Sequence, residues 1–352
     1  MLTHTSAQMH IAAKRVFRLS LTVALSLAVA YGSAQTMPFM APLFAFILGA
    51  APRPPMGPKG LLGLLLALCV MLSSGLLLIP MLLHYPVTAL LVALCGLFFA
   101  NYVTLHLGKP QVGVLLTIGV TLISAMGLMG YGIAVLLIKA MCINIAVAVL
   151  CQWLVYPLFP EEGPTPAPPP PPRPLQSSWL ALRATLIVFP SYLLVLSNPA
   201  MYAPIIMKSV ALGQQVSETD VRSAGRELLG STLMAALLAI IMWYCLKLLP
   251  NLWMFFLWTL AFSVFIVARV YGVAKTRYSP GFWSNVLITL LIFIGPAVGD
   301  TESGKDPYKA SAVRLGLFVG VTLYAWLTLV FLDWLRERQE SRQQALPGAE
   351  TE

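Results

Sequence analysis

A single lysine lies inside an otherwise apolar run of the sequence. Residues 133–149 read "IAVLLIKAMCINIAVAV", and Lys139 is the only charged residue among them. A charged side chain at the centre of a bilayer costs roughly 2.5–3.5 kcal/mol on insertion scales. Lys139 is therefore expected near a membrane boundary, beside a compensating group, or facing a polar cavity.

A second cation occupies a matching position later in the chain. The segment "KAMCINIAVAVLCQWLVY", which begins at Lys139, aligns without gaps with "RLGLFVGVTLYAWLTLVF", which begins at Arg314. Two cations on the outer side of a membrane protein would attract an anion, and Asn144 adds a polar group further along the first helix. We predict that Lys139, Arg314 and Asn144 bind an anionic substrate. A lysine whose amine only reaches out to the interface would explain Lys139 equally well.

Two short apolar segments carry prolines at corresponding positions. Residues 37–50 contain Pro42, and residues 198–212 contain Pro204. Proline inside a helix removes a backbone hydrogen bond, and a helix that restarts after it offers N–H groups at its positive end to an anion. Matching interrupted segments in two halves point to a transport site. We therefore expect Pro42 and Pro204 at the substrate site near an internal two-fold axis, unless they only mark the ends of the two segments.

The carboxylates are absent from the apolar segments. All thirteen lie in loops, in tails or at segment edges. An intramembrane Asp or Glu is the usual proton relay of a secondary transporter. A proton-coupled mechanism in this chain would therefore depend on the edge residues Asp300, Glu227 or Asp333.

Motifs for enzymatic chemistry are absent from the sequence. There is no G-x-x-x-x-G-K-[ST] motif for ATP. The five cysteines show no C-x-x-C spacing, and the four histidines are scattered. No cluster of acid, base and nucleophile is present. We predict that the chain is not an enzyme and uses neither a cofactor nor a metal.

The elements that position these residues are predicted to be membrane-spanning helices. The chain is 59% hydrophobic and 10% charged, with a mean hydropathy of +0.83. Apolar stretches recur that are long enough to cross a ~30 Å hydrocarbon core as helices, and the alternating pattern of a β-barrel is missing. We predict an all-α polytopic membrane protein of about twelve spans: 16–32, 37–50, 61–80, 87–106, 111–129, 131–157, 179–196, 198–212, 228–248, 251–272, 282–298 and 310–334. Spans two and eight are short and contain the prolines described above.

The twelve spans are predicted to form two parallel repeats of six. The order of the spans, the placement of their prolines and the matched cations recur in both halves. The predicted organisation is a first transmembrane repeat over 1–158, a Pro-rich linker over 159–178, a second repeat over 179–336 and a tail over 337–352. Five consecutive prolines, 168–172, make the linker a stiff polyproline II spacer.

Loop charges predict the orientation of the chain. Most Lys and Arg residues fall on the side that holds both termini and the linker, which by the positive-inside rule is the cytoplasmic side. The same bias accounts for the net charge of +9, so nucleic acid is not a predicted partner. The first span also has the composition of a cleavable signal peptide. Its counterpart at residues 183–204 favours a retained helix.

The chain resembles the fusaric acid resistance and aromatic acid exporter superfamily, in particular its compact bacterial inner-membrane branch. The residues that carry the resemblance are "APLFAFILGAAPRPP" from Ala41, "GKPQVG" from Gly108 and "LVYPLFPEE" from Leu154. The resemblance implies export of small, often aromatic, organic acids across the bacterial inner membrane, frequently with a periplasmic membrane-fusion adaptor. Larger exporters of this kind carry a cytoplasmic domain between the halves, where this chain has only the proline linker.

The predicted function is therefore an inner-membrane efflux permease for small organic, and in particular aromatic, anions. A passive anion channel and a non-transporting membrane scaffold for an adaptor are the two alternatives that the sequence leaves open. The predicted partners are the anion, membrane lipid and an adaptor. The sequence also leaves open whether the chain forms homo-oligomers.

Overall fold

The computed structural model describes residues 2–107, 110–161, 174–199, 201–203, 205–206, 208–210, 221–302 and 307–344. Over these ranges the chain is helical and contains no β-strand. Ten helices within the described residues are long and apolar enough to cross a membrane. The predicted all-α polytopic membrane fold is confirmed.

The first half contains helices whose starts are set largely by proline. They are α1 (Leu2–Gly32), α2 (Met40–Gly49), α3 (Pro58–His84), α4 (Pro86–His106), α5 (Pro110–Ile118), the π-helical η1 (Gly119–Ile123), α6 (Ser124–Met129), α7 (Tyr131–Val155) and the short 3-10 helix η2 (Tyr156–Leu158). Proline suits the first turn of a helix because its missing N–H would have no partner there. Gly130, at φ 155°, separates α6 from α7 in a conformation that favours glycine.

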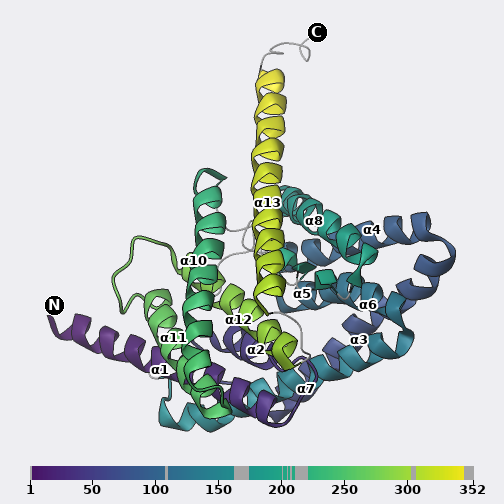
Figure 1. Cartoon of the computed structure of the whole chain (residues 1–352). Coiled ribbons are helices and arrows are strands. Elements are labelled where there is room, and N and C mark those ends of the chain that lie inside the picture. Colours follow the sequence, from purple (N-terminus) through teal and green to yellow (C-terminus); the bar gives the residue numbers. More distant parts are fainter. Residues whose placement is uncertain are drawn as a thin grey trace.

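The second half contains α8 (Pro174–Ser197), α10 (Val221–Leu248), α11 (Leu252–Val270), α12 (Pro280–Glu302) and α13 (Pro307–Gln344). Ten of the predicted spans coincide with the ten candidate membrane helices, and the span predicted over 37–50 coincides with α2. The span predicted over 198–212 is described only in part, where its residues are helical. Helix α13 extends well beyond the other helices toward the C-terminus (Figure 1).

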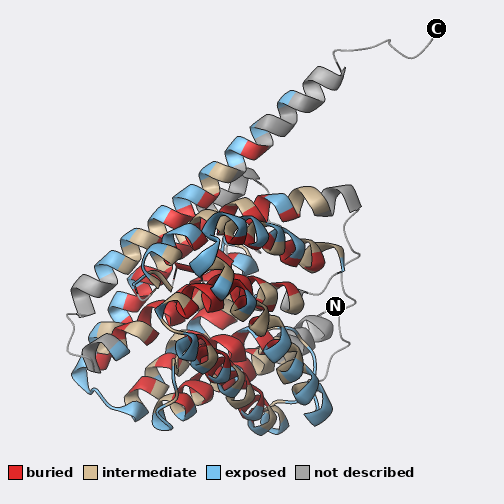
Figure 2. Ribbon diagram, turned by 90° about the vertical axis from the view of Figure 1, so that its right-hand side faces the viewer, coloured by how far each residue is buried: buried red, intermediate tan, exposed pale blue. Residues whose placement is uncertain are grey.

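The burial pattern is that of a chain surrounded by lipid. Buried residues concentrate in the middle of the helix assembly, and exposed residues lie on its outside (Figure 2). The outer face of α3 alone exposes Leu62, Leu66, Val70 and Leu77. Soluble monomers rarely expose apolar surface of this extent. The outer surface therefore fits contact with acyl chains.

The two halves exchange helices with each other. Helix α1 packs along α11, and α8 packs along α4 (Figure 1). Each of these pairs joins the first predicted span of one half to the fourth predicted span of the other. The Tyr31 hydroxyl donates to the Gly295 carbonyl at 3.2 Å, and the Asn101 amide donates to Thr185 Oγ1 at 3.1 Å. This reciprocal packing is the arrangement that a two-fold axis between the halves produces.

Helix α2 lies between the halves and is not exposed to lipid as a spanning helix would be. Its ten residues extend only about 15 Å at 1.5 Å per residue, too short to cross the bilayer. Eight of the ten are buried. The helix contacts α1, α7 and α12, and a Cβ on Gly295 would come within 2.1 Å of Phe39 Cβ just before α2. The predicted short second span is confirmed.

A candidate anion-binding cavity

A cavity of about 460 Å³ lies at one end of the first half. Helices α1, α2, α3, α5 and α7 and the loop after α2 surround it. Its lining residues are Arg18, Leu19, Thr22, Leu48, Gly49, Arg53, Pro54, Pro55, Met56, Gly60, Leu64, Ala67, Met71, Val112, Leu115, Gln152 and Tyr156. The volume is in the range typical of sites for small organic ligands.

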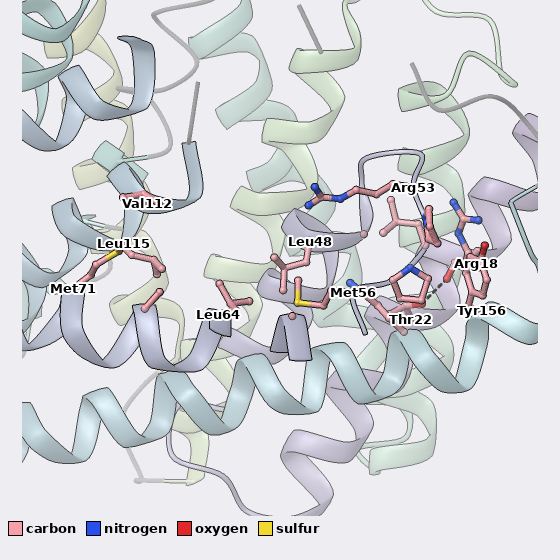
Figure 3. A pocket seen from close by; sticks show the side chains of 17 residues that line it. Arg18, Thr22, Leu48, Arg53, Met56, Leu64, Met71, Val112, Leu115 and Tyr156 are labelled. Carbon is pink, nitrogen blue, oxygen red and sulfur yellow. Dashed lines mark hydrogen bonds between the residues drawn. The ribbon is translucent and has the colours of Figure 1, made fainter. Parts of the chain in front are cut away.

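The cavity is polar at one end and apolar at the other. Figure 3 shows Arg18 and Tyr156 at one end, Arg53 extending from that end toward Leu48, and Met71 and Leu115 at the opposite end. Among the described lining residues there is no Asp or Glu. An amphipathic anion could therefore place its charge near the guanidinium groups and its apolar body along the far wall.

The lining residues come from the middle of α1, the first half of α3, α5 and the ends of α2 and α7. The loop charges predict that the side of the molecule that holds Arg18 and Arg53 is cytoplasmic. Close packing shapes the cavity near Gly49, where a Cβ would come within 2.9 Å of Leu19 Cδ1 and 3.3 Å of Gln152 Nε2.

Arg18 is held in place by the segment that follows α7. Its Nη2 donates to Glu161 Oε2 at 2.7 Å, and its Nη1 donates to the Phe159 carbonyl at 3.3 Å. The guanidinium also lies over the Tyr156 ring, 5.7 Å from its centroid. One turn earlier on α1, Arg15 donates to Glu161 Oε1 from Nε at 2.8 Å and also from Nη2.

Glu161 is almost fully buried between these two arginines. Its side chain is 4% exposed, compared with 9% for Arg18 and 21% for Arg15. Burial by itself raises the pKa of a carboxyl group, but the hydrogen bonds and charges of Arg15 and Arg18 outweigh it and hold the pKa of Glu161 below its ordinary value. The Glu161 carboxylate is therefore ionised at neutral pH.

Lys139 lies on the outer face of α7, not in the interior. It is exposed and shares one helical stripe with the exposed residues Leu136, Ile143 and Leu150. The predicted role of Lys139 in binding a substrate inside the molecule does not fit this placement. The physical reason is that α7 is apolar on all sides, so its sequence contains no polar stripe that marks the buried face. An outward lysine can extend its amine toward the membrane interface.

Arg314 and Asn144 lie apart from this cavity. Arg314 is half-buried near the start of α13, whereas Asn144 is fully buried on α7. The Asn144 side chain donates to the Thr36 carbonyl at 3.1 Å and to the Ala140 carbonyl at 2.8 Å. These bonds tie the connection between α1 and α2 to α7. The structure does not bring Lys139, Arg314 and Asn144 together around the described cavity.

Pro42 lies in the first turn of α2 and neither kinks nor breaks it. The free N–H groups that were expected at this helix start are already used, because Met40 N donates to the Met37 carbonyl and Ala41 N to the Pro38 carbonyl, at 3.0 and 3.3 Å. These two N–H groups, which precede Pro42, are therefore not free to bind an anion. Pro204 lies outside the described residues.

Of the three proton-coupling candidates, Glu227 alone has a described side chain, and it does not line the cavity. Glu227 is half-buried near the start of α10. The backbones of Asp300 and Asp333 belong to α12 and α13, and their side chains lie outside what the structure describes. Within the described part of the chain, no three His, Cys, Asp or Glu residues lie together in a way that could hold a metal ion.

A buried lysine network in the second half was missed by the sequence reasoning, which counted Lys208 only as a cytoplasmic-edge charge. Lys208 is fully buried, and its Nζ donates to Asn285 Oδ1 at 3.1 Å and to Thr289 Oγ1 at 2.8 Å. The Asn285 amide donates in turn to Ser231 Oγ at 2.5 Å. A polar residue at 285 and another at 289, one helical turn apart, is the signal that would have located it.

The Arg15, Arg18 and Glu161 cluster was also missed. The arginines served only to predict orientation, and Glu161 was assigned to the linker. The available signal is that two cations three residues apart in α1 lie on one helical face, while a carboxylate directly follows the last helix of the same half.

One comparison with known protein families gives a match. Residues 15–155 are similar to the family described as "Protein of unknown function (DUF2955)". The matched range contains every residue that lines the cavity except Tyr156. No curated protein and no solved structure matches the chain.

Proposed function

We propose that this multi-pass membrane protein is an efflux permease of the bacterial inner membrane for small organic, and in particular aromatic, anions. The observation that carries the proposal is the two-ended cavity of about 460 Å³, with arginines at one end and apolar side chains at the other. A carboxylate joined to an aromatic ring has the same division into a charged end and an apolar body.

Electrostatics favour an anion over a neutral ligand. Arg18 and Arg53 line the cavity, Arg15 lies one helical turn before Arg18, and Glu161 is the carboxylate in contact with Arg15 and Arg18. The mouth therefore carries an excess of positive charge. Arg53 is exposed, so it can attract an anion from solution before the anion enters.

The resemblance to the fusaric acid resistance and aromatic acid exporter superfamily supports the same substrate class. It also carries the expectation of a periplasmic membrane-fusion adaptor, which stays a prediction. The loop charges predict that the side of the molecule holding Arg18 and Arg53 faces the cytoplasm, as uptake of a substrate for export requires.

Transport of radiolabelled benzoate by purified protein in proteoliposomes tests the proposal. Met71→Trp places a large ring at the apolar end of the cavity and should lower benzoate flux at least about tenfold, an effect of the size that misplaced substrates produce. Leu77→Trp is the matched control on the same helix, because Leu77 is 74% exposed on the outer face. Equal flux in Met71→Trp and the wild type would contradict the proposal.

The same vesicles separate a permease from a channel. A permease driven by protons accumulates benzoate above its equilibrium distribution when a pH gradient is imposed, whereas a channel only equilibrates it. Accumulation supports export by secondary transport. Flux without accumulation would favour the channel, and no flux of any tested anion would favour the scaffold.

A further inference from the structure

We propose that the Arg15 and Arg18 pair is the carboxylate-binding subsite of the cavity, and that Glu161 occupies this subsite in place of a substrate carboxylate. The inference rests on the proposed function, since it assigns the group that recognises the anionic end of the same substrates. In this role the segment after α7, which is part of the same chain, competes with the substrate for the two arginines.

The contacts around Glu161 are those of a bound carboxylate ligand. Each of its two oxygens accepts from a different arginine, with Arg15 on Oε1 and Arg18 on Oε2. Bonds between guanidinium and carboxylate groups are among the stronger and more specific ones in proteins. A free carboxylate in the same place would satisfy the same donors.

Arg18 joins this carboxylate site to the cavity. Its side chain lines the cavity and also bonds to Glu161, which is not itself a lining residue. A substrate bound in the cavity would direct its charged end toward Arg18. Because a guanidinium has five N–H donors, Arg18 can pass from the internal carboxylate to the external one without losing its pairing.

The position of Glu161 in the chain makes it a tethered group. It follows η2 by three residues and is the last described residue before the Pro-rich segment. Its backbone N–H donates to the Tyr156 hydroxyl at 3.4 Å, and Tyr156 lines the cavity. Displacement of Glu161 would therefore detach the start of the linker from the mouth of the cavity.

Proteolysis at Glu161 tests this exchange directly. In the Glu162→Gln variant, Glu161 is the only acidic residue in the linker over 159–178, so a glutamate-specific protease reports its release. In nanodiscs of phosphatidylcholine, benzoate should raise the rate of cleavage after Glu161 in a saturable manner. Benzamide, the neutral counterpart of benzoate, should leave this rate unchanged.

Three results of this assay would overturn the proposal. The first is a cleavage rate that does not respond to benzoate, and the second is an equal response to benzamide. The third is a rise caused by phosphatidylglycerol in the nanodisc but not by benzoate, which would assign the arginines to lipid headgroups. The readout involves no transport. Absent flux with a positive cleavage assay would therefore reject only the export function, and flux with a negative assay would reject only the subsite.

Binding affinity provides the second measurement. If Glu161 leaves the subsite open about one tenth of the time, removing its charge should tighten the Kd for benzoate about tenfold. Glu161→Gln should show this full gain. Glu161→Asp keeps the charge but shortens its reach, so its Kd should lie between those of Glu161→Gln and the wild type. An unchanged or weaker affinity in Glu161→Gln would overturn the proposal. The proteolysis assay decides the matter if that variant does not fold.

Discussion

At the scale of single residues, buried charge is managed in two different ways in the two halves. In the first half Glu161 pairs with Arg15 and Arg18, while in the second half Lys208 bonds only to neutral partners among the described contacts, Asn285 and Thr289. A buried charge without such partners is costly. Both arrangements therefore depend on particular side chains and are sensitive to single substitutions.

Asn285→Ala should destabilise the protein by about 1–3 kcal/mol. The change removes an acceptor from the fully buried Lys208 and a donor from Ser231, and leaving buried polar groups without their partners has a cost of this size. Thermal unfolding in detergent measures the effect. Ser33→Ala removes an exposed hydroxyl and should change stability by less than about 0.5 kcal/mol. Equal stability of the two variants would contradict the importance of the network.

The stability difference between the wild type and Glu161→Gln should depend on pH. The arginines lower the pKa of Glu161 in the folded state, so the unfolded state binds the proton more readily. The contribution of the carboxylate is therefore fully present above the unfolded pKa of about 4.3 and is lost as the pH falls through the lower folded pKa. Unfolding measured from pH 7 to pH 3 tests this. A difference that grows on acidification would have the wrong sign.

At the scale of elements, close packing of helices depends on small residues. Helix α3 crosses the π-helical η1 at Gly75 and Gly119, where a Cβ on Gly75 would lie 2.0 Å from the Gly119 carbonyl oxygen. The clash is with backbone, which cannot turn away as a flexible side chain can. This contact positions α3 against the α5–η1–α6 span, and both elements contribute residues to the cavity.

Gly75→Ala should therefore destabilise the protein by about 3 kcal/mol or more, at the upper end of what overpacking costs. Gly63→Ala is the matched control on the same helix, because a Cβ there meets nothing within 4 Å. Alanine favours helix more than glycine does, so the control should be neutral or slightly stabilising. The midpoint of thermal unfolding and the yield of folded protein measure both variants. A Gly75→Ala variant as stable as Gly63→Ala would show that the helices can separate without cost.

At the scale of the whole molecule, α1 packs against the second half and α8 against the first. The number of spans and the loop charges then predict which side of the membrane the cavity faces. Six spans in each half, as the sequence predicts, would place the termini and the linker on one side of the membrane, and the loop charges predict that this side is cytoplasmic. The candidate cavity lies on the same side, because Arg18, Arg53 and Tyr156 are close to it. The orientation of the chain therefore decides whether the cavity faces the cytoplasm, from which an exported anion comes, or the opposite side of the membrane.

Labelling of single cysteines tests this orientation. In a background without the five native cysteines, Thr165→Cys in the linker should react with a membrane-impermeant maleimide only after the cells are opened. Ser303→Cys, in the connection between α12 and α13, should react in intact cells. The opposite pattern would reverse the membrane orientation, and the cavity would then be unable to take up substrate from the cytoplasm.

The sequence by itself determined the class of the protein and the positions of its helices. Span length and apolar composition are local properties, and prolines at 58, 86, 110 and 280 mark helix starts through local backbone geometry. These features do not depend on what each helix packs against. For this reason the expected spans agree closely with the observed helices. The exception is the span over 198–212, which is described only in part.

Only the tertiary structure decided which side chains meet. An all-round apolar helix such as α7 presents no stripe that identifies its buried face, so the outward direction of Lys139 follows from packing alone. Arg18 and Glu161 are 143 positions apart, and Lys208 and Asn285 are 77 apart. Such pairs form because the fold buries both side chains away from water, so that each forms its hydrogen bonds with the other. The spacing of residues along a chain does not contain that information.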